Sequence, residues 1–358
     1  MKILFWVPYP TEGQSNRFRV EQYLPYLSAA GIDYSVRPFV SSEFYRILYE
    51  PNRCWLKIYF FIKSFLKRII DLLSTSKYNL VFVHREAFPF GPPIFEILSS
   101  RLFNKPLIYD FDDAIFLAER SYANRAISFL KNPGKVAGII SFSEQVIVGN
   151  DYLKEYAQRI NKNITVIPTP VDTEKYKPLN SSKKDRIVVG WIGSHSTAEY
   201  LLELKDVFRK LKKGNPDIVI RLIGAEKYRE QLLLTECHAW KLEDEIAELG
   251  SFDIGLMPMP DNLWTRGKCA FKLLLYMGMG IPAVCSPVEM NREIIRDGEN
   301  GFFASSPEEW LKRIQTLIKD QDLRKKIGLQ GRKTVEEKYA LSLWAPVFID
   351  VLKKTIER

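Results

Sequence analysis

The sequence predicts an α/β protein with two doubly wound, Rossmann-like domains that face a cleft. Short apolar runs alternate with segments of helical periodicity along the 358 residues, a pattern typical of parallel sheets with crossover helices. The pattern breaks near residues 168–185, which hold prolines and a polar run, and then starts again. Ligands of such sheets bind beyond the carboxyl ends of the strands, so two of these domains are expected to hold a ligand between them.

In the first half, apolar runs predict strands at residues 3–7, 34–36, 80–84, 107–110, 138–142 and 165–167. The stretch PTPVD at 168–172 and the polar run at 180–185 follow, and they give the best domain boundary. We therefore expect an N-terminal domain over 1–172 and a C-terminal domain over 173–340. A last amphipathic helix within 341–358 closes the chain and can return to the N-terminal domain.

The second half repeats the alternation. Strands are expected at residues 187–192, 218–223, 254–257 and 282–285. Helices are expected at residues 198–211, 271–277, 307–318 and 323–338. The two halves thus look like two copies of one architecture rather than an array of short repeats.

The composition is that of an ordinary globular protein, with 46% apolar and 27% charged residues. No run of about 18 uncharged apolar residues occurs, so no membrane-spanning helix is expected. The first apolar run ends at Pro8, which makes it too short for a signal peptide. The four cysteines lie far apart without metal-ligand spacing, which favours a reduced, cytoplasmic protein.

The formal net charge of +9 is compatible with anionic small substrates, an anionic membrane face or nucleic acid. No zinc spacing and no basic-aromatic RNA-binding motif accompany it, so nucleic acid is not an expected partner.

A basic turn precedes the helix expected at 271–277. It contains Arg266, Gly267 and Lys268, and Lys272 follows one helical turn later. Helix N-termini present unpaired N–H groups and partial positive charge, and glycine lets a ligand approach the backbone closely. The turn therefore predicts a diphosphate site. The alternative is a solvated helix start whose basic side chains point to water.

The same stretch resembles the donor-binding segment of family 4 glycosyltransferases. Residues 272–284, KLLLYMGMGIPAV, are similar to the family's K-L-L-E-Y-M-A-x-G-x-P-V-V, and residues 293–302, EIIRDGENGF, to its E-I-I-x-D-G-x-N-G-F. The resemblance implies the GT-B fold of two Rossmann-like domains. It also implies transfer of a sugar from a nucleoside-diphosphate sugar, with retention and without a metal or other cofactor. The acceptor, whether a glycan, a lipid-linked sugar or a small molecule, is not readable from the sequence.

Further segments extend this resemblance over most of the chain: GQSNRFR at 13–19, VFVHRE at 81–86, PLIYDFDD at 106–113, VGNDYL at 148–153, VIPTPVD at 166–172 and GWIGS at 190–194. It places the donor-binding residues at Gly13, Arg17, Gly193, Ser194, Arg266, Gly267, Lys268, Lys272 and Glu293. It places the acceptor-side residues at Arg19, His84, Glu86 and Asp110. Ion pairs at the surface are the alternative for the two arginines, and ordinary structural roles are the alternative for His84 and Glu86.

The chain departs from the family in two respects. Many members carry two glutamates seven residues apart in the donor segment, and Gly267 and Leu275 occupy those positions here. Neither side chain can accept a hydrogen bond. A basic pair common after the first donor-domain strand is replaced by the run SHS at 194–196. A nucleotide-sugar epimerase and a non-catalytic nucleotide-binding protein of the same fold are therefore the alternatives.

Acidic residues crowd the end of the strand at 107–110, at Asp110, Asp112 and Asp113. Crowded carboxylates are costly unless they face hydroxyls, cations or helix N-termini. Asp112 aligns with a histidine that many relatives keep beside the transferred sugar, so we expect it to be the catalytic residue. The alternative is that Asp112 or Asp113 caps a following helix, since aspartate is a good N-cap.

The segment from Trp55 to Leu73 predicts an amphipathic helix with a basic polar arc. That arc contains Lys57, Lys63, Ser64, Lys67, Arg68 and Asp71. Aromatic and aliphatic residues cover the other side, a combination that suits an anionic bilayer at the inner face of the membrane. The alternative, which we favour on the sequence alone, is a helix that packs its apolar stripe on the N-terminal sheet.

Overall fold

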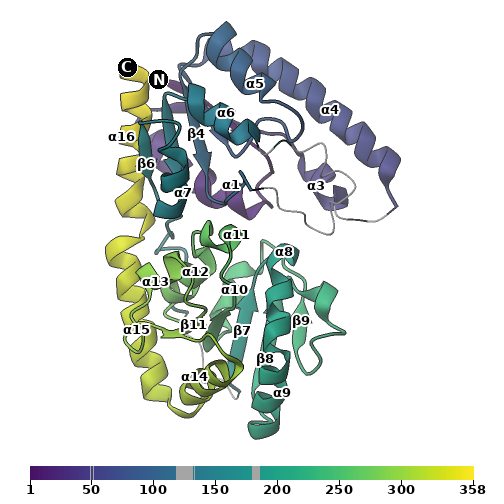
Figure 1. Ribbon diagram of the computed structural model, residues 1–358, viewed down its shortest axis with the longest axis vertical. Coiled ribbons are helices and arrows are strands. Elements are labelled where there is room, and N and C mark those ends of the chain that lie inside the picture. Colours follow the sequence, from purple (N-terminus) through teal and green to yellow (C-terminus); the bar gives the residue numbers. More distant parts are fainter. Residues whose placement is uncertain (49, 51, 118–131, 133, 180–185) are drawn as a thin grey trace. The chain divides into compact units, whose positions relative to one another are not determined.

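The computed structural model describes residues 1–48, 50, 52–117, 132, 134–179 and 186–358. It divides into two compact units, one of Met1–Thr169 with Leu341–Arg358 and the other of Pro170–Ala340. Each unit contains a six-stranded sheet in which all paired strands are parallel, with helices around it (Figure 1). The α/β class with two doubly wound sheets is thus confirmed.

In unit 1 the strand order is β2-β1-β3-β4-β5-β6. The strands are β1 (Lys2–Val7), β2 (Asp33–Pro38), β3 (Leu80–His84), β4 (Leu107–Phe111), β5 (Gln145–Val148) and β6 (Ile164–Val166). The helices are α1 (Gln14–Arg19), α2 (Leu24–Ala29), α3 (Ser42–Leu48), α4 (Cys54–Leu73), α5 (Ile94–Ile97), α6 (Gly134–Phe142), α7 (Asp151–Ala157) and α16 (Leu341–Glu357). The direction of winding reverses between β1 and β3, so the loops after these strands diverge and leave room for polar side chains.

The last helix, α16, belongs to the core of unit 1 although about 170 residues of unit 2 precede it. Phe348 stacks on Tyr23 with ring centroids 4.2 Å apart and contacts the Phe82 ring of β3 at 5.5 Å. Leu352 is fully buried in the same cluster. Burial of such aromatic and aliphatic side chains is the main stabilising contribution to this unit.

In unit 2 the order is β12-β11-β10-β7-β8-β9. The strands are β7 (Val188–Ile192), β8 (Val219–Ile223), β9 (Glu236–His238), β10 (Ile254–Met257), β11 (Ala283–Cys285) and β12 (Phe302–Phe303). The helices are α8 (His195–Ala198), α9 (Lys205–Gly214), α10 (Glu245–Gly250), α11 (Leu263–Arg266), α12 (Phe271–Gly278), α13 (Met290–Ile294), α14 (Pro307–Lys319) and α15 (Gln321–Lys338). This is the Rossmann order, with its switch point between β7 and β10.

Two local predictions are wrong, and two short strands were missed. Residues 138–142 belong to helix α6, which buries Val136, Ile139 and Ile140 on one face, and the strand follows at β5. A short apolar run does not by itself distinguish a buried strand from a buried helix. The helix expected at 198–211 is divided into α8, a 3₁₀ stretch at Glu199–Leu204 and α9. The short edge strands β9 and β12 were not predicted.

Helix α4 forms where the sequence predicts it, but most of its apolar side does not pack on the protein. Its buried residues are Ser64, Arg68, Asp71 and Leu72, whereas most of its large apolar side chains are exposed. The favoured expectation of an apolar stripe packed on the sheet is therefore wrong. No helix in the described part of the chain has the length and apolarity to cross a membrane.

Candidate functional site

In unit 2, the turn after β7 lies at the switch point and is built around Gly193. The Gly193 N–H donates to the carbonyl of Ile223 at 3.0 Å, which ties the turn to β8. A Cβ at Gly193 would lie 2.5 Å from the Trp191 ring and 2.6 Å from Cε of Lys272. Only glycine lets the lysine chain pass this close to the backbone.

Lys272 crosses from the first turn of α12 to the turn after β7. Its Nζ donates to Oγ1 of Thr197 at 2.7 Å and lies 4.8 Å from the centre of the Trp191 ring. These contacts hold a cation beside the switch point, where ligands of doubly wound sheets bind. Sequence reasoning missed Thr197 and Trp191, because the fold rather than the sequence brings them to a lysine about 75 residues away.

Gly224, at the end of β8, holds the Gly193 turn from the other side. It has a φ of +82°, and a Cβ there would lie 2.0 Å from the Gly193 carbonyl oxygen. The residue was not singled out from the sequence, although a glycine directly after an apolar strand was an available signal.

The basic turn at 266–268 does not open α12 directly, as the sequence suggested. Arg266 ends α11, Gly267 is the C-cap of that helix, and α12 begins at Phe271. The Arg266 Nε donates to Asp261 at 2.7 Å, and the Lys268 Nζ lies 5.3 Å from the Trp264 ring. Asn262 and Thr265 form a capping box that fixes the start of α11.

The remaining donor-side residues are more dispersed. Ser194 is the N-cap of α8, and its hydroxyl lies 2.9 Å from that of Ser196. Glu293 lies on α13 in a polar hollow that it shares with side chains of α15. Leu275, which occupies a family glutamate position, is buried in α12. The Lys272 and Gly193 contacts thus form the compact part of the donor-side set.

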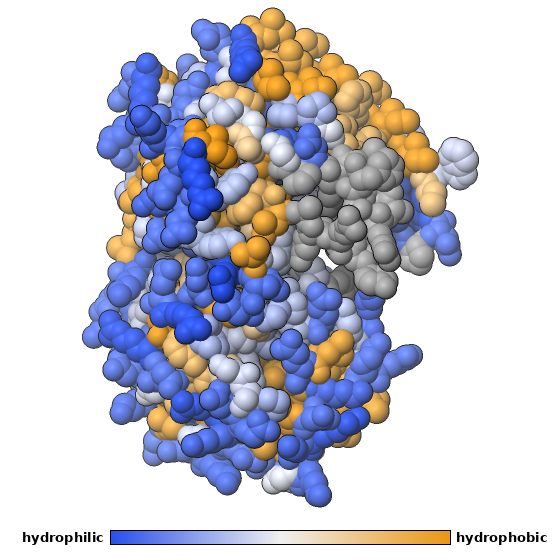
Figure 2. Space-filling model, in the orientation of Figure 1, coloured by the Kyte–Doolittle hydropathy of each residue, from blue (hydrophilic) through white to orange (hydrophobic). Residues whose placement is uncertain are grey.

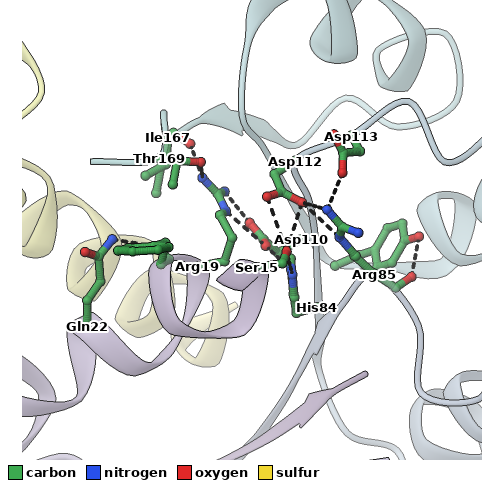
Figure 3. Close-up of polar contacts among 12 residues, drawn as sticks. Ser15, Arg19, Gln22, His84, Arg85, Asp110, Asp112, Asp113, Ile167 and Thr169 are labelled. Carbon is green, nitrogen blue, oxygen red and sulfur yellow. Dashed lines mark hydrogen bonds and ion pairs between the residues drawn. The ribbon is translucent and has the colours of Figure 1, made fainter. Parts of the chain in front are cut away.

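In unit 1, the side chain of His84 joins strands β3 and β4 to helix α1 (Figure 3). It ends β3 directly opposite Asp110 of β4, and its Nδ1 lies 2.6 Å from Asp110 Oδ2. Its Nε2 lies 2.6 Å from the hydroxyl of Ser15 in α1. His84 is fully buried and Asp110 is 1% exposed, whereas Ser15 is only partly buried.

Arg19, predicted on the acceptor side, is enclosed in this network. Its guanidinium forms a two-point contact with Asp110, and Nη1 donates to the Ile167 carbonyl at 2.7 Å. Burial alone would raise the pKa of Asp110, but the charge of Arg19 and the hydrogen bond from His84 outweigh it and hold the pKa below its ordinary value. Arg19 and Asp110 therefore fix the ring of His84.

Arg17 lies in α1, and Gly13 directly precedes that helix. The Arg17 guanidinium is 4.7 Å from the Phe18 ring, and the residue is 6% exposed. Gly13 is the N-cap of α1, and a Cβ there would lie 2.4 Å from Cβ of Tyr9. The close approach of Tyr9 thus explains the glycine at the turn after β1.

Asp112 is held as an anion by Arg85. Nε and Nη2 of Arg85 donate to Asp112 Oδ1 at 3.0 and 2.7 Å, and Arg85 also pairs with Asp113 (Figure 3). The Ser15 hydroxyl lies 3.3 Å from both carboxylate oxygens of Asp112. Burial would raise the pKa of Asp112, but Arg85 above all lowers it well below its ordinary range.

Arg85 was not among the predicted site residues. It has a φ of +60°, an uncommon conformation for a residue other than glycine. In this conformation the side chain of Arg85 reaches Asp112 and Asp113. No pattern in the sequence signals this contact. The alternative role of Asp112 or Asp113 as a helix cap is wrong, because the residues from 112 to 117 form bends and turns and no helix begins among them. Glu86 pairs with Lys135 of α6 and is 30% exposed.

Comparisons with known proteins agree with this geometry. The sequence of residues 186–320 matches the family model of glycosyl transferases group 1. This segment, less than half of the chain, is thus similar to a group 1 glycosyl transferase domain. That domain coincides with most of unit 2 and includes Gly193, Thr197 and Lys272. A curated relative, the putative glycosyltransferase EpsD of Bacillus subtilis (strain 168), is 42% identical over 55 residues, which are 15% of this chain and 14% of that protein.

Solved structures resemble the whole chain. A glycosyltransferase from Rickettsia africae ESF-5 has a TM-score of 0.70 at 15% identity and covers 100% of this chain and 99% of its own. Anabaena Alr3699/HepE, in complex with UDP-glucose, has a TM-score of 0.71 at 14% identity, over 99% of this chain and 100% of its own. Sucrose-phosphate synthase from Thermosynechococcus elongatus has a TM-score of 0.70 at 12% identity, over 99% of this chain and 98% of its own. At these identities the likeness concerns the fold, and it confirms the GT-B class.

Proposed function

We propose that the chain is a glycosyltransferase that moves a sugar from a nucleoside-diphosphate sugar to a glycan, lipid-linked or small-molecule acceptor, with retention of configuration. The observation that carries the proposal is the Lys272–Thr197 contact over the Gly193 turn, at the switch point of a sheet in the group 1 domain. We place the reaction in the cytoplasm. The four cysteines lie far apart in the sequence without metal-ligand spacing, which favours a reducing compartment.

On the donor side, the diphosphate would approach the turn after β7. Gly193 leaves room at the backbone, and Lys272 brings a positive charge to within 2.7 Å of Thr197. As the bond to the sugar breaks, negative charge develops on the leaving phosphate, and a fixed cation stabilises that charge. Arg266 and Lys268 would supply further charge without a metal. The Anabaena protein was crystallised with UDP-glucose and with UDP, which makes uridine nucleotides the first donors to test.

In unit 1, Asp112 is the proposed catalytic carboxylate. Its lowered pKa keeps it ionised at neutral pH, so it would accept a hydrogen bond from a sugar hydroxyl rather than act as an acid. Arg85 orients the carboxylate, and Ser15 lies beside it. His84, Asp110 and Arg19 would position Ser15 from behind and would not touch the sugar themselves.

We expect the purified protein to release nucleoside diphosphate slowly from at least one member of a nucleoside-diphosphate-sugar panel, even without an acceptor. Asp112→Asn should lower that turnover about tenfold to a hundredfold, as expected for a lost hydrogen bond to a charged group. Its thermal stability should stay close to wild type, because asparagine can still accept from Arg85.

Asp113→Asn is the matched control, because it removes the neighbouring carboxylate from the same arginine. Its turnover should stay near wild type. Formation of an epimeric nucleotide sugar would replace the proposal by an epimerase. Consumption of none of the donors would favour a protein that only binds nucleotide, and equal rates for Asp112→Asn and wild type would remove Asp112 from the site.

A further inference from the structure

Helix α4 attaches to unit 1 through polar residues and through the rings of Phe60, Phe61 and Phe65, which pack against other aromatic rings of the unit. Arg68 is 1% exposed; its Nη2 donates to the Arg37 carbonyl at 3.2 Å, and its guanidinium lies 5.3 Å from the Trp6 ring. Asp71 is buried 3.6 Å from Arg68 and from Arg37. Ser64 is buried on the same side. The part of the polar arc formed by Ser64, Arg68 and Asp71 thus faces the protein.

The opposite face of α4 is apolar and exposed. It presents nine large hydrophobic side chains: Trp55, Leu56, Ile58, Tyr59, Ile62, Phe65, Leu66, Ile70 and Leu73. Their exposed fractions range from 36% at Phe65 to 85% at Trp55. The helix appears in Figure 2 as a continuous hydrophobic band along one edge of unit 1. Soluble proteins rarely leave such a large contiguous apolar surface in water unless a partner covers it.

The charges on this surface are of one sign. Lys63 and Lys67 are exposed beside the apolar side chains. The one acidic residue within α4 is Asp71, which is buried on the other side. A surface that combines apolar side chains with exposed cations is complementary to anionic lipid headgroups above an acyl layer.

We propose that the exposed face of α4 docks flat on an anionic lipid bilayer. A helix of 20 residues spans about 30 Å and would lie in the plane of the interface. Its apolar side chains enter the headgroup boundary, while Lys63 and Lys67 extend along the helix to reach phosphates. Trp55 and Tyr59 bring amphipathic rings to one end.

A second copy of the chain fits this face less well. A two-fold dimer through α4 would bury Lys63 and Lys67 from both copies, and α4 has no exposed carboxylate to pair with them. The bilayer proposal does not depend on the proposed sugar transfer, so a protein without transferase activity would still be expected to bind vesicles.

The test is co-sedimentation of the full chain with phosphatidylcholine vesicles that contain or lack about one-third phosphatidylglycerol. Wild-type protein should bind the anionic vesicles at low salt and be released at high salt. Lys63→Gln with Lys67→Gln should weaken binding more than about tenfold, since each basic residue near such a surface contributes about fivefold. Arg68 is kept because it is buried, and Lys57 because it donates to the Glu50 carbonyl.

A second variant, Ile62→Ser with Leu66→Ser and Ile70→Ser, should also lose vesicle binding while it keeps the wild-type melting temperature. The matched controls lie on α15 of unit 2, where Lys325, Lys326 and Leu329 are exposed. Lys325→Gln with Lys326→Gln, and Leu329→Ser, should bind like wild type. Three results would overturn the proposal: wild type that ignores anionic vesicles at low salt, α4 variants that bind as wild type does, or a solution dimer that the triple serine variant converts to monomer.

Discussion

Replacing Asp110 by alanine should lower the free energy of unfolding by about 3–5 kcal/mol, the usual cost of breaking a buried ion pair from one side. Arg19 would remain buried, at 2% exposure, without its carboxylate partner. His84 would also lose the acceptor that lies 2.6 Å from its Nδ1. Urea unfolding followed by circular dichroism and by tryptophan fluorescence measures this change.

Two controls distinguish the loss of the buried Arg19–Asp110 ion pair from a general effect of removing a charge. Asp350→Ala breaks an exposed ion pair with Lys354 in the same unit and should cost at most about 1 kcal/mol. The double replacement Arg19→Met with Asp110→Leu should recover much of the lost stability, because an apolar pair leaves no buried charge. A loss below about 1 kcal/mol for Asp110→Ala would contradict the assigned role.

The Asp110 carboxylate also makes the free energy of unfolding depend on pH in a definite direction. The pKa of Asp110 is lower in the folded than in the unfolded chain, because Arg19 and His84 outweigh its burial. Its contribution to stability is therefore complete above its unfolded pKa of about 4 and declines as the pH falls below that value. Asp110→Asn should be less stable than wild type at neutral pH, and the difference should shrink in acid.

Replacing Lys272 by alanine should weaken nucleoside-diphosphate binding by about 1–3 kcal/mol, or about fivefold to 150-fold. The charge is held 2.7 Å from Thr197 at the switch point of unit 2, where the diphosphate is proposed to bind. Isothermal titration calorimetry measures the affinity directly, starting with uridine diphosphate.

Lys272→Met separates charge from packing, because it keeps an aliphatic chain beside Trp191 and removes the cation. It should lose as much affinity as the alanine variant. Lys213→Ala, an exposed lysine in the last turn of α9, should bind like wild type. Wild-type affinity in both Lys272 variants would remove this lysine from the donor site.

The fold was predictable because apolar periodicity and loop chemistry agree along most of the chain. The error at 138–142 arose where helix α6 buries so much apolar surface that its sequence resembles an inner strand. Helix α4 shows a different difficulty. Its segregation into two faces was predicted, but the orientation depends on Trp6 and Arg37, which give the polar arc its partners inside unit 1.

The candidate sites were only partly predictable. The strand-end positions of His84 and Asp110 followed from the strand pattern, since adjacent parallel strands end at the same edge. The contacts that define their roles join residues far apart in the sequence, such as Ser15 with His84, and no local pattern encodes them. Arg85 was missed for the same reason.

The central claim is that unit 2 binds the nucleotide of the sugar donor at the Gly193 turn and the start of α12. Hydrogen–deuterium exchange of the full chain, with and without saturating nucleoside diphosphate, tests it most directly. The account predicts slower exchange at residues 190–197 and 264–275, which carry the Gly193 turn, Thr197 and Lys272. Protection confined to unit 1, or unchanged exchange in both segments under conditions where calorimetry shows binding, would contradict it.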